Sequence, residues 1–131
     1  MLADAAHWFL DPDVLFQSNL IAAAFAMAGF VLMLSARRLF KRAGTAIKPY
    51  DQPSKLVVDG PYQLSRNPMY LGVTLILLGI AFWVGTYPFY LVSGVFCFTM
   101  NFVFIPNEEK ILESTFGNDY LSYKSRTRRW I

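Results

Sequence analysis

Residues 60–72 read GPYQLSRNPMYLG, and within this stretch a polar, turn-forming segment runs into a long apolar one. Gly60-Pro61 is a turn signal, and Asn67-Pro68 places a good N-cap residue before a proline, which is favoured at the first position of a helix. We predict that a helix starts at Pro68. Its free N–H groups and positive dipole end would face Tyr62 and Arg66, forming a candidate anion site at a membrane surface. An ordinary capped helix, anchored among lipid headgroups by Arg66 and the tyrosines, explains the same residues.

Two long uncharged runs lie on either side of a polar segment. The chain has 131 residues, of which 55% are hydrophobic and 16% charged, so it is more apolar than an average soluble domain. No charge occurs in the 23 residues between Asp13 and Arg37, or in the 41 residues between Arg66 and Glu108. A helix needs about 20 apolar residues to cross a bilayer, so the first run can hold one span and the second can hold two. We predict an all-α membrane protein with a single domain over residues 1–131 and three transmembrane helices, at about 14–36, 68–84 and 89–105.

The basic residues give the expected orientation. All 12 Lys and Arg residues lie in two blocks, at 37–66 and at 110–129, and none precedes the first apolar run. Positively charged loops stay in the cytoplasm, so we expect the N-terminus outside and the C-terminus in the cytoplasm, in an inner membrane of bacterial type. Anionic lipid headgroups beside the spans explain the net charge of +3, and no nucleic-acid motif accompanies it.

Polar segments complete the predicted fold. Residues 1–13 are typical of a short interfacial segment. The loop 37–66 contains glycines and prolines, so we expect no long helix there, and a loop of this length usually binds something or acts as a lid. Two short cytoplasmic helices are expected near the C-terminus, the first capped by Asn107 and ending at Gly117, and the second capped by Asn118.

Several residue types favour structural roles. Small residues between Ala22 and Gly29 predict close packing of the first span against another helix. The single Cys97 lies in the third apolar run and is expected to pack there. The tail 126–131 suits lipid headgroups. Phosphate-cradling glycine loops, a Ser/His/Asp set and zinc-type Cys/His spacing are absent from the sequence, so we expect no metal.

The second and third spans should form an antiparallel hairpin. They are joined by a short turn, Gly85–Pro88, so both of their other ends would lie at the cytoplasmic face. The hairpin then brings residues 67–70 and 106–109 to the same side of the membrane, although about 40 residues separate them in the sequence. Glu108 would emerge from the bilayer close to Arg66 and the tyrosines.

The order of motifs from about residue 45 to the C-terminus resembles a known family. The motifs are Leu56-Val57, Gly60-Pro61-Tyr62, RNPMYLG at 66–72, EEKIL at 108–112 and FGNDYLSY at 116–123. They are similar to those of the integral-membrane methyltransferases of the isoprenylcysteine carboxyl methyltransferase and phospholipid methyltransferase group. The resemblance implies that residues 45–131 build a cofactor pocket at the cytoplasmic ends of the last spans, roofed by the C-terminal helices.

By this resemblance the chain would use S-adenosylmethionine to methylate a lipophilic or small-molecule acceptor, which would enter from the bilayer. The implied cofactor-binding residues are Ser54, Lys55, Leu56, Val57, Tyr62, Asn67, Pro68, Met69, Tyr70, Glu108 and Glu109. Arg66 is the candidate for positioning a polar or anionic group. A carboxylate can accept hydrogen bonds from ribose hydroxyls or an amino group, and tyrosine rings can lie against a sulfonium or an adenine.

Two departures from the family pattern bear on the acceptor. The family often has His at the position of Asn67, and its prenylcysteine branch carries an arginine shortly before the paired glutamates, whereas residues 101–107 contain none. An amine headgroup or a small thiol therefore remains open as the acceptor. A non-catalytic membrane protein for assembly or lipid interaction is the alternative interpretation, and a membrane reductase is a third.

Overall fold

The computed structural model describes residues 16–44 and 55–131, and in these residues the regular structure is helical, with no β-strand. The prediction of an all-α fold is thus confirmed. The expected interfacial segment 1–13 and the candidate Ser54 lie outside the described residues. The elements are the α-helices α2 (Asn19–Ala43), α3 (Pro68–Val84), α4 (Tyr87–Thr99), α5 (Ile105–Phe116) and α6 (Asn118–Arg126), the 3-10 helix η1 (Gly60–Gln63) and the π-helix η2 (Met100–Phe104).

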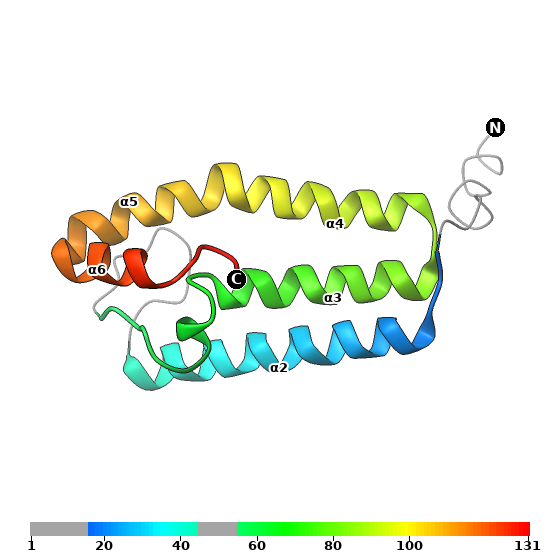
Figure 1. The fold of residues 1–131 in the computed structure, drawn as a ribbon, viewed down its shortest axis with the longest axis horizontal. Helices are drawn as coiled ribbons and strands as arrows, with labels where there is room; N and C mark the ends of the chain where they lie inside the picture. The colour runs from blue at the N-terminus through cyan, green and yellow to red at the C-terminus, as the bar shows by residue number, and fades with distance from the viewer. Residues whose placement is uncertain (1–15, 45–54) are drawn as a thin grey trace.

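Helices α2 and α3 pack antiparallel and very closely (Figure 1). The contact is made by small residues: a Cβ atom added to Gly72 would lie 2.7 Å from the Gly29 carbonyl oxygen, and one added to Gly79 would lie 3.0 Å from the Ala22 carbonyl oxygen. Side chains at these positions would force the two backbones apart. The predicted packing role of the small residues in the first span is therefore confirmed.

The first span has different limits from those predicted. Helix α2 begins at Asn19, where the Ser18 hydroxyl accepts a hydrogen bond from Ile21 N, and it continues past residue 36 to Ala43. The expectation that residues 37–66 contain no long helix is wrong for the first seven of these residues. No glycine or proline occurs among residues 37–43, and Gly44 ends the helix with φ of 70°. The helix dipole favours the basic residues Lys41 and Arg42 in the last turn.

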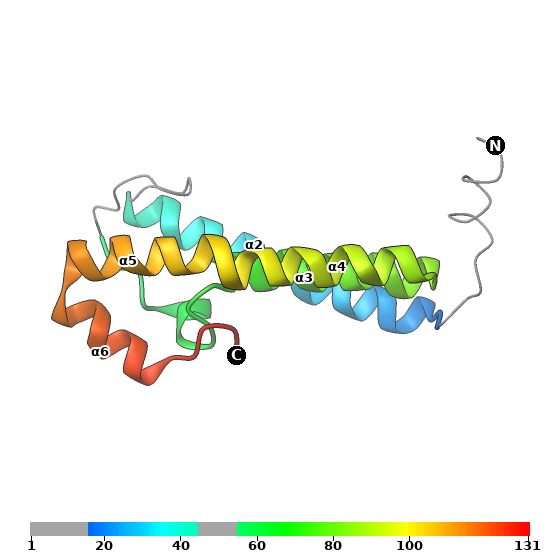
Figure 2. The ribbon, with the colours of Figure 1, turned by 90° about the horizontal axis from the view of Figure 1, so that it is seen from above.

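Elements α4, η2 and α5 form one continuous rod, Tyr87–Phe116 (Figure 2). The prediction that Asn107 caps a separate helix is wrong, because its side-chain amide instead donates to the Val103 carbonyl oxygen, 2.7 Å away, within the rod. Pro106 lies just inside α5. Its ring would clash with the carbonyl of Phe102 in a regular α-helix, and the wider π turn beside it accommodates this residue.

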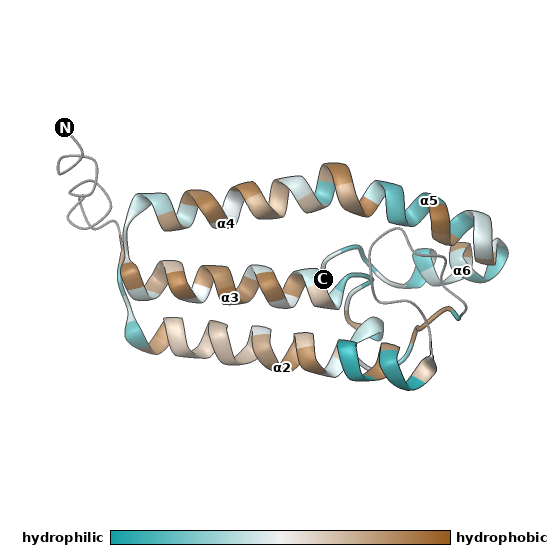
Figure 3. Cartoon of the chain, turned by 180° about the vertical axis from the view of Figure 1, so that it is seen from behind, coloured by the Kyte–Doolittle hydropathy of each residue, from teal (hydrophilic) through white to brown (hydrophobic). Residues whose placement is uncertain are grey.

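Two helices are long and apolar enough to cross a membrane, namely Asn19–Ala43 with 25 residues and Tyr87–Phe116 with 30. Helix α3 is apolar too, but it has 17 residues, so three spans are not confirmed by helix length. Apolar residues cover α3, α4 and much of α2, whereas hydrophilic residues gather at the end of α2 and in α5 and α6 (Figure 3).

The C-terminal part folds back across this hydrophilic end. Helix α5 ends at Gly117, as predicted, and α6 follows at once. Gly117, not Asn118, holds the N-cap position of α6, so the predicted cap is wrong. The chain end lies near the start of α3 in Figure 1. The buried cluster at this end consists of Ala36, Tyr62, Tyr120 and Tyr123, with Leu39, Phe40, Leu56, Val57, Val58, Met69, Leu112 and Phe116 packed against it.

Candidate functional site

The first turn of α3 meets the start of α5, as the predicted hairpin requires. The Tyr70 hydroxyl donates a hydrogen bond of 2.5 Å to Glu108 Oε1, across 38 residues of sequence. Tyr70 and Glu108 therefore lie close enough to contact one ligand, and the expected convergence of residues 67–70 and 106–109 is confirmed.

Glu108 lies just beyond the apolar part of the rod, at the end of the uncharged run that begins after Arg66. Its side chain is half-buried, and this burial raises the pKa of the carboxyl, while the hydrogen bond from Tyr70 opposes the rise. A carboxylate with one oxygen bonded to Tyr70 still has lone pairs for a second donor. Glu108 can thus accept a further hydrogen bond from a ligand hydroxyl or amine.

Tyr62 stands on the 3-10 turn beside this pair. It is 5% exposed, and its ring lies 5.2 Å from that of Phe40. Its carbonyl oxygen accepts a hydrogen bond of 2.6 Å from the Tyr123 hydroxyl. Burial raises the pKa of Tyr62, with the nearby Tyr123, Glu108 and Tyr70 adding to the rise, so its hydroxyl stays protonated. The turn is held by α2 on one side and by α6 on the other.

The predicted strip before the turn reaches the same cluster. Leu56 and Val57 pack against the tyrosines together with Met69 from the first turn of α3. Lys55 is exposed at the start of the strip. Residues from three separate predicted motifs therefore share one apolar cluster next to Tyr70 and Glu108.

Asn67 occupies the N-cap position of α3 but does not cap it through its side chain. The prediction of a side-chain cap is wrong, because the Asn67 amide donates to the Arg129 carbonyl oxygen, 3.0 Å away, and so joins the C-terminal tail to this turn. The Asn67 backbone N–H donates instead to the Ser65 hydroxyl, at 3.0 Å. Pro68 is buried at the first helical position, as expected.

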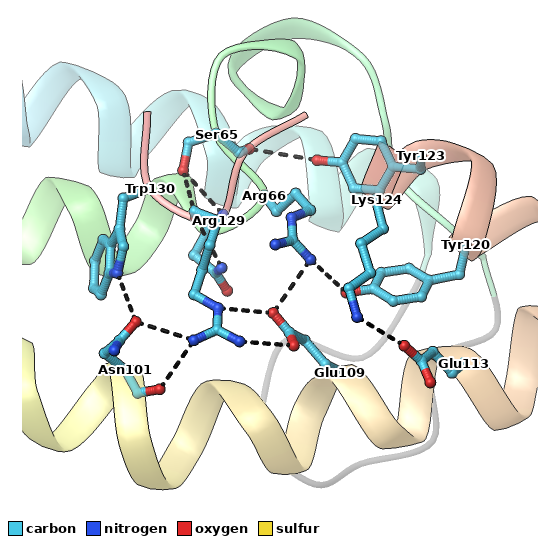
Figure 4. Close-up of polar contacts among 11 residues, drawn as sticks. Ser65, Arg66, Asn101, Glu109, Glu113, Tyr120, Tyr123, Lys124, Arg129 and Trp130 are labelled. Atoms are coloured by element: carbon cyan, nitrogen blue, oxygen red, sulfur yellow. Dashed lines mark hydrogen bonds and ion pairs between the residues drawn. The ribbon is translucent and has the colours of Figure 1, made fainter. Parts of the chain in front are cut away.

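Glu109 differs from its neighbour Glu108 in its partners, and those of Glu109 are drawn in Figure 4. Its two carboxylate oxygens accept a bidentate pair from Arg129, with Nε at 2.9 Å and Nη2 at 3.0 Å. Arg66 Nη1 also contacts Glu109 Oε1, at 3.2 Å, and donates to the Tyr120 hydroxyl at 3.2 Å. Glu109 is thus the buried centre of a polar network that joins α5, α6, the tail and the turn before α3. Within this network Arg66 Nε is buried and lacks a hydrogen-bond partner in the described part of the chain.

Arg129 is the residue that sequence reasoning missed. Besides Glu109 it reaches the π-helix, where Nη1 donates to the backbone and side-chain oxygens of Asn101 at 3.2 and 3.1 Å. Trp130 Nε1 donates to the same Asn101 oxygen at 3.1 Å. The tail was expected at lipid headgroups, yet Arg129 is engaged inside the protein, and of the three tail arginines only Arg126 and Arg128 are exposed. No sequence signal pointed to this role, because the π-helix at Asn101, which Arg129 contacts, is visible only in the structure.

Tyr62, Tyr70 and Glu108, with the strip at Leu56 and Val57, form one candidate site at the hydrophilic end of the bundle, called the corner below. It offers a carboxylate acceptor at Glu108, protonated tyrosines, an apolar strip at Leu56 and Val57, and the first turn of α3. Such a set suits a ligand with hydroxyl or amino donors, a planar ring and a positive charge. Glu109 supports this corner through its ion pairs with Arg66 and Arg129.

Comparison with known proteins gives two matches to this chain. A family model described as phospholipid methyltransferase matches residues 18–119. An uncharacterized protein of Haemophilus influenzae is 41% identical over 63 residues, which are 48% of this chain and the whole of that protein. No solved structure matches.

Proposed function

The chain belongs to the phospholipid methyltransferase family, and from this premise we propose that it transfers a methyl group from S-adenosylmethionine to a lipophilic acceptor at the cytoplasmic face of a membrane. Membership implies a methyltransferase and lipid substrates in a membrane. We further propose the cofactor, the residues that bind it and the orientation of the helices in the membrane. The observation that carries it is the hydrogen bond between Tyr70 and Glu108, because it places an acidic acceptor beside the tyrosine cluster.

The residues of the corner fit this cofactor by their chemistry. Glu108 would accept hydrogen bonds from its hydroxyl or amino groups, Tyr62 and Tyr70 would face its ring or its positive charge, and the backbone N–H groups that begin α3 would meet its carboxylate. Leu56, Val57 and Met69 would cover its apolar parts. The proposed cofactor set also includes Ser54, Lys55, Asn67, Pro68 and Glu109, of which Asn67 and Glu109 would act by holding the tail against the site.

When bound, S-adenosylmethionine supplies an electrophilic methyl group on a sulfonium: the carbon–sulfur bond breaks, its electron pair stays on sulfur, and the acceptor's lone pair forms the new bond to carbon. The protein's part is placement and exclusion of water, since orientation alone can contribute about 7–11 kcal/mol. Arg66 would position a polar or anionic group of the acceptor through its guanidinium, of which Nε lacks a partner in the described residues. Its neighbours Glu109 and Tyr120 fix the orientation of this guanidinium.

The proposed membrane arrangement rests on the lengths of the apolar helices and on the positions of the basic residues. We place α2, α3 and the apolar part of the α4–η2–α5 rod across the bilayer, with α3 crossing as the close partner of α2. The basic residues at the end of α2 and in the tail would lie in the cytoplasm. The cofactor would then enter from the cytoplasm and the acceptor from the bilayer.

Two measurements test the proposal on the detergent-purified protein. Calorimetric titration with S-adenosylhomocysteine should show saturable binding, and heat absent up to millimolar ligand would remove the cofactor assignment. Membranes with and without the protein should then receive methyl-labelled S-adenosylmethionine. Mass spectrometry of lipids and small molecules should find a labelled product that depends on the protein.

A further inference from the structure

A second, apolar site is lined by Leu71, the residue that follows Tyr70, but not by Tyr70 or Glu108. An open groove of about 630 Å³ runs between α2 and α3. It is lined by Met27, Ala28, Val31, Leu32 and Ser35 of α2, Leu71 and Leu75 of α3, and Pro61, Leu64 and Ile131 at one end. The groove is separate from the corner that holds Glu108.

The lining restricts the occupant to hydrocarbon. The single polar side chain in the lining is Ser35, and its hydroxyl already donates to the Val31 carbonyl oxygen at 2.7 Å. A polar ligand would lose its hydration in this groove without gaining a partner. The volume is within the usual range for small-molecule sites.

Two arginines lie on the groove-facing side of α2, beyond its apolar part. Positions 31, 35, 38 and 42 succeed one another at helical spacing, so Arg38 and Arg42 lie on the face that Val31 and Ser35 present to the groove. Both arginines are exposed. A hydrocarbon chain in the groove that ends in a phosphate would meet these two guanidinium groups as it leaves the apolar stretch.

We propose that this groove binds one acyl chain of a membrane phospholipid whose phosphate is held by Arg38 and Arg42. Guanidinium groups bind phosphate by bidentate hydrogen bonds, and the helix C-terminus around Lys41 and Arg42 lies where the polar border of the membrane is expected. Ile131 and Leu64 border the end of the groove near Ser35, where the chain would leave toward the two arginines. Ile131 is two residues from Arg129 and Leu64 is two residues from Arg66, so a bound chain would contact both segments that support the corner.

The lipid site can be tested with a substitution that fills the groove. Ala28→Trp places a large ring in the lining, whereas Ala23→Trp places the same ring on another exposed part of the same helix. Detergent-purified proteins would be incubated with palmitoyl-oleoyl phosphatidylglycerol, and the fraction that retains lipid would be measured by native mass spectrometry. We expect Ala28→Trp to weaken lipid binding at least tenfold, and Ala23→Trp to change it less than twofold. Equal binding by wild type and a folded Ala28→Trp protein would overturn the proposal.

The phosphate is tested separately. The double variant Arg38→Gln and Arg42→Gln should weaken binding by about fivefold for each arginine, and dioleoylglycerol, which lacks phosphate, should bind more weakly than the phospholipid to wild type. Unchanged binding in both comparisons would refute the phosphate contact.

Two further measurements separate the groove from the proposed activity. The affinity for S-adenosylhomocysteine should be unchanged in Ala28→Trp, and lipid retention should be unchanged in Glu108→Gln. The cofactor site and the lipid groove can therefore each be disproved without affecting the other. When the protein is instead loaded with palmitoyl-oleoyl phosphatidylethanolamine, whose headgroup carries an amine, label on the retained lipid after one turnover with methyl-labelled S-adenosylmethionine would identify the groove as the acceptor's site. Retained lipid without label would identify a resident lipid, and both results agree with the binding proposed here.

Discussion

The Tyr70 hydroxyl and the Glu108 carboxylate lie 2.5 Å apart, on two helices that are connected only through a turn at the other end of the bundle. This hydrogen bond joins the first turn of α3 to the start of α5. Both residues remain accessible enough to receive a ligand, since each is only partly buried. The pair is therefore the place where substitutions report most directly on the proposed cofactor site.

Replacing Glu108 should weaken cofactor binding. We expect Glu108→Ala to lower the affinity for S-adenosylhomocysteine at least tenfold, because a hydrogen bond to a charged group contributes about 1.5–3 kcal/mol. Calorimetry measures the effect. The matched control is Glu113→Gln on the same helix. The Glu113 side chain is 40% exposed and pairs with Lys124 at 3.0 Å, and its replacement should change the affinity less than twofold. Equal affinities for Glu108→Ala and wild type would exclude Glu108 from the site.

Glu108 should also make stability depend on pH. Burial raises the pKa of its carboxyl in the folded protein, so the folded state favours the protonated form. The stability that this contributes is present below the ordinary pKa of a glutamate, about 4.3, and is lost as the pH rises through the higher folded value. Glu108→Gln stays neutral throughout. The unfolding temperature of Glu108→Gln relative to wild type should therefore increase between pH 4 and pH 8, and a constant or falling difference would contradict the assignment.

Arg129 should matter more for stability than its neighbour. Arg129→Gln leaves the Glu109 carboxylate, which is 11% exposed, without its bidentate partner. We expect a loss of about 1.5–3 kcal/mol in the free energy of unfolding, the range for hydrogen bonds to a charged group, because Arg66 still pairs with Glu109 and Arg129 itself is partly exposed. Denaturant unfolding in detergent measures it, with Arg128→Gln as the exposed control.

The double variant gives the second half of this test. Glu109→Gln combined with Arg129→Gln removes both groups of the bidentate pair, so the double variant should lose less stability than the sum of the two single variants. If the double variant is as unstable as the sum of the two single variants, the ion pair is not the source of the effect.

The contact between α2 and α3 should tolerate no side chain. In Gly72→Ala the new methyl group would lie 2.7 Å from the Gly29 carbonyl oxygen, so the helices must separate and the unfolding temperature should fall by several degrees. Gly94→Ala on α4 is the control, since its Cβ meets nothing within 4 Å and alanine favours a helix. An equal response to both substitutions would show that the close contact is unimportant.

The sequence predicted the elements better than their limits. Charge-free runs placed the helices, and Pro68 and Gly117 fixed two of their ends correctly, because each acts through its own backbone. Helix α2 ran on to Ala43 because charged residues at a membrane border do not break a helix, whereas the prediction equated the end of the apolar run with the end of the helix. The continuous rod through Pro106 was missed for the same kind of reason: proline is usually read as a boundary, and a π turn accommodates it here.

The partners of the site residues were beyond the sequence. Glu108 and Glu109 are adjacent and chemically identical, yet one faces Tyr70 and the other faces Arg129. Their roles depend on the rotation of one helix by a single residue, which tertiary contacts determine. The amide of Asn67 likewise binds a carbonyl of the tail instead of its own helix, since Ser65 is close enough to accept the Asn67 backbone N–H.

The unbroken course of the rod from Tyr87 to Phe116 has a mechanical consequence. From Tyr87 to Glu108 the axis is about 32 Å long at 1.5 Å per residue, so a swing of about 5° at its outer end would carry Glu108 through about 3 Å. Because α2 and α3 are locked backbone to backbone, such a swing can occur only at the short joint between α3 and α4. The hydrogen bonds between Glu109 and Arg129 lie far from that joint, so they restrain rotation of the whole rod about it.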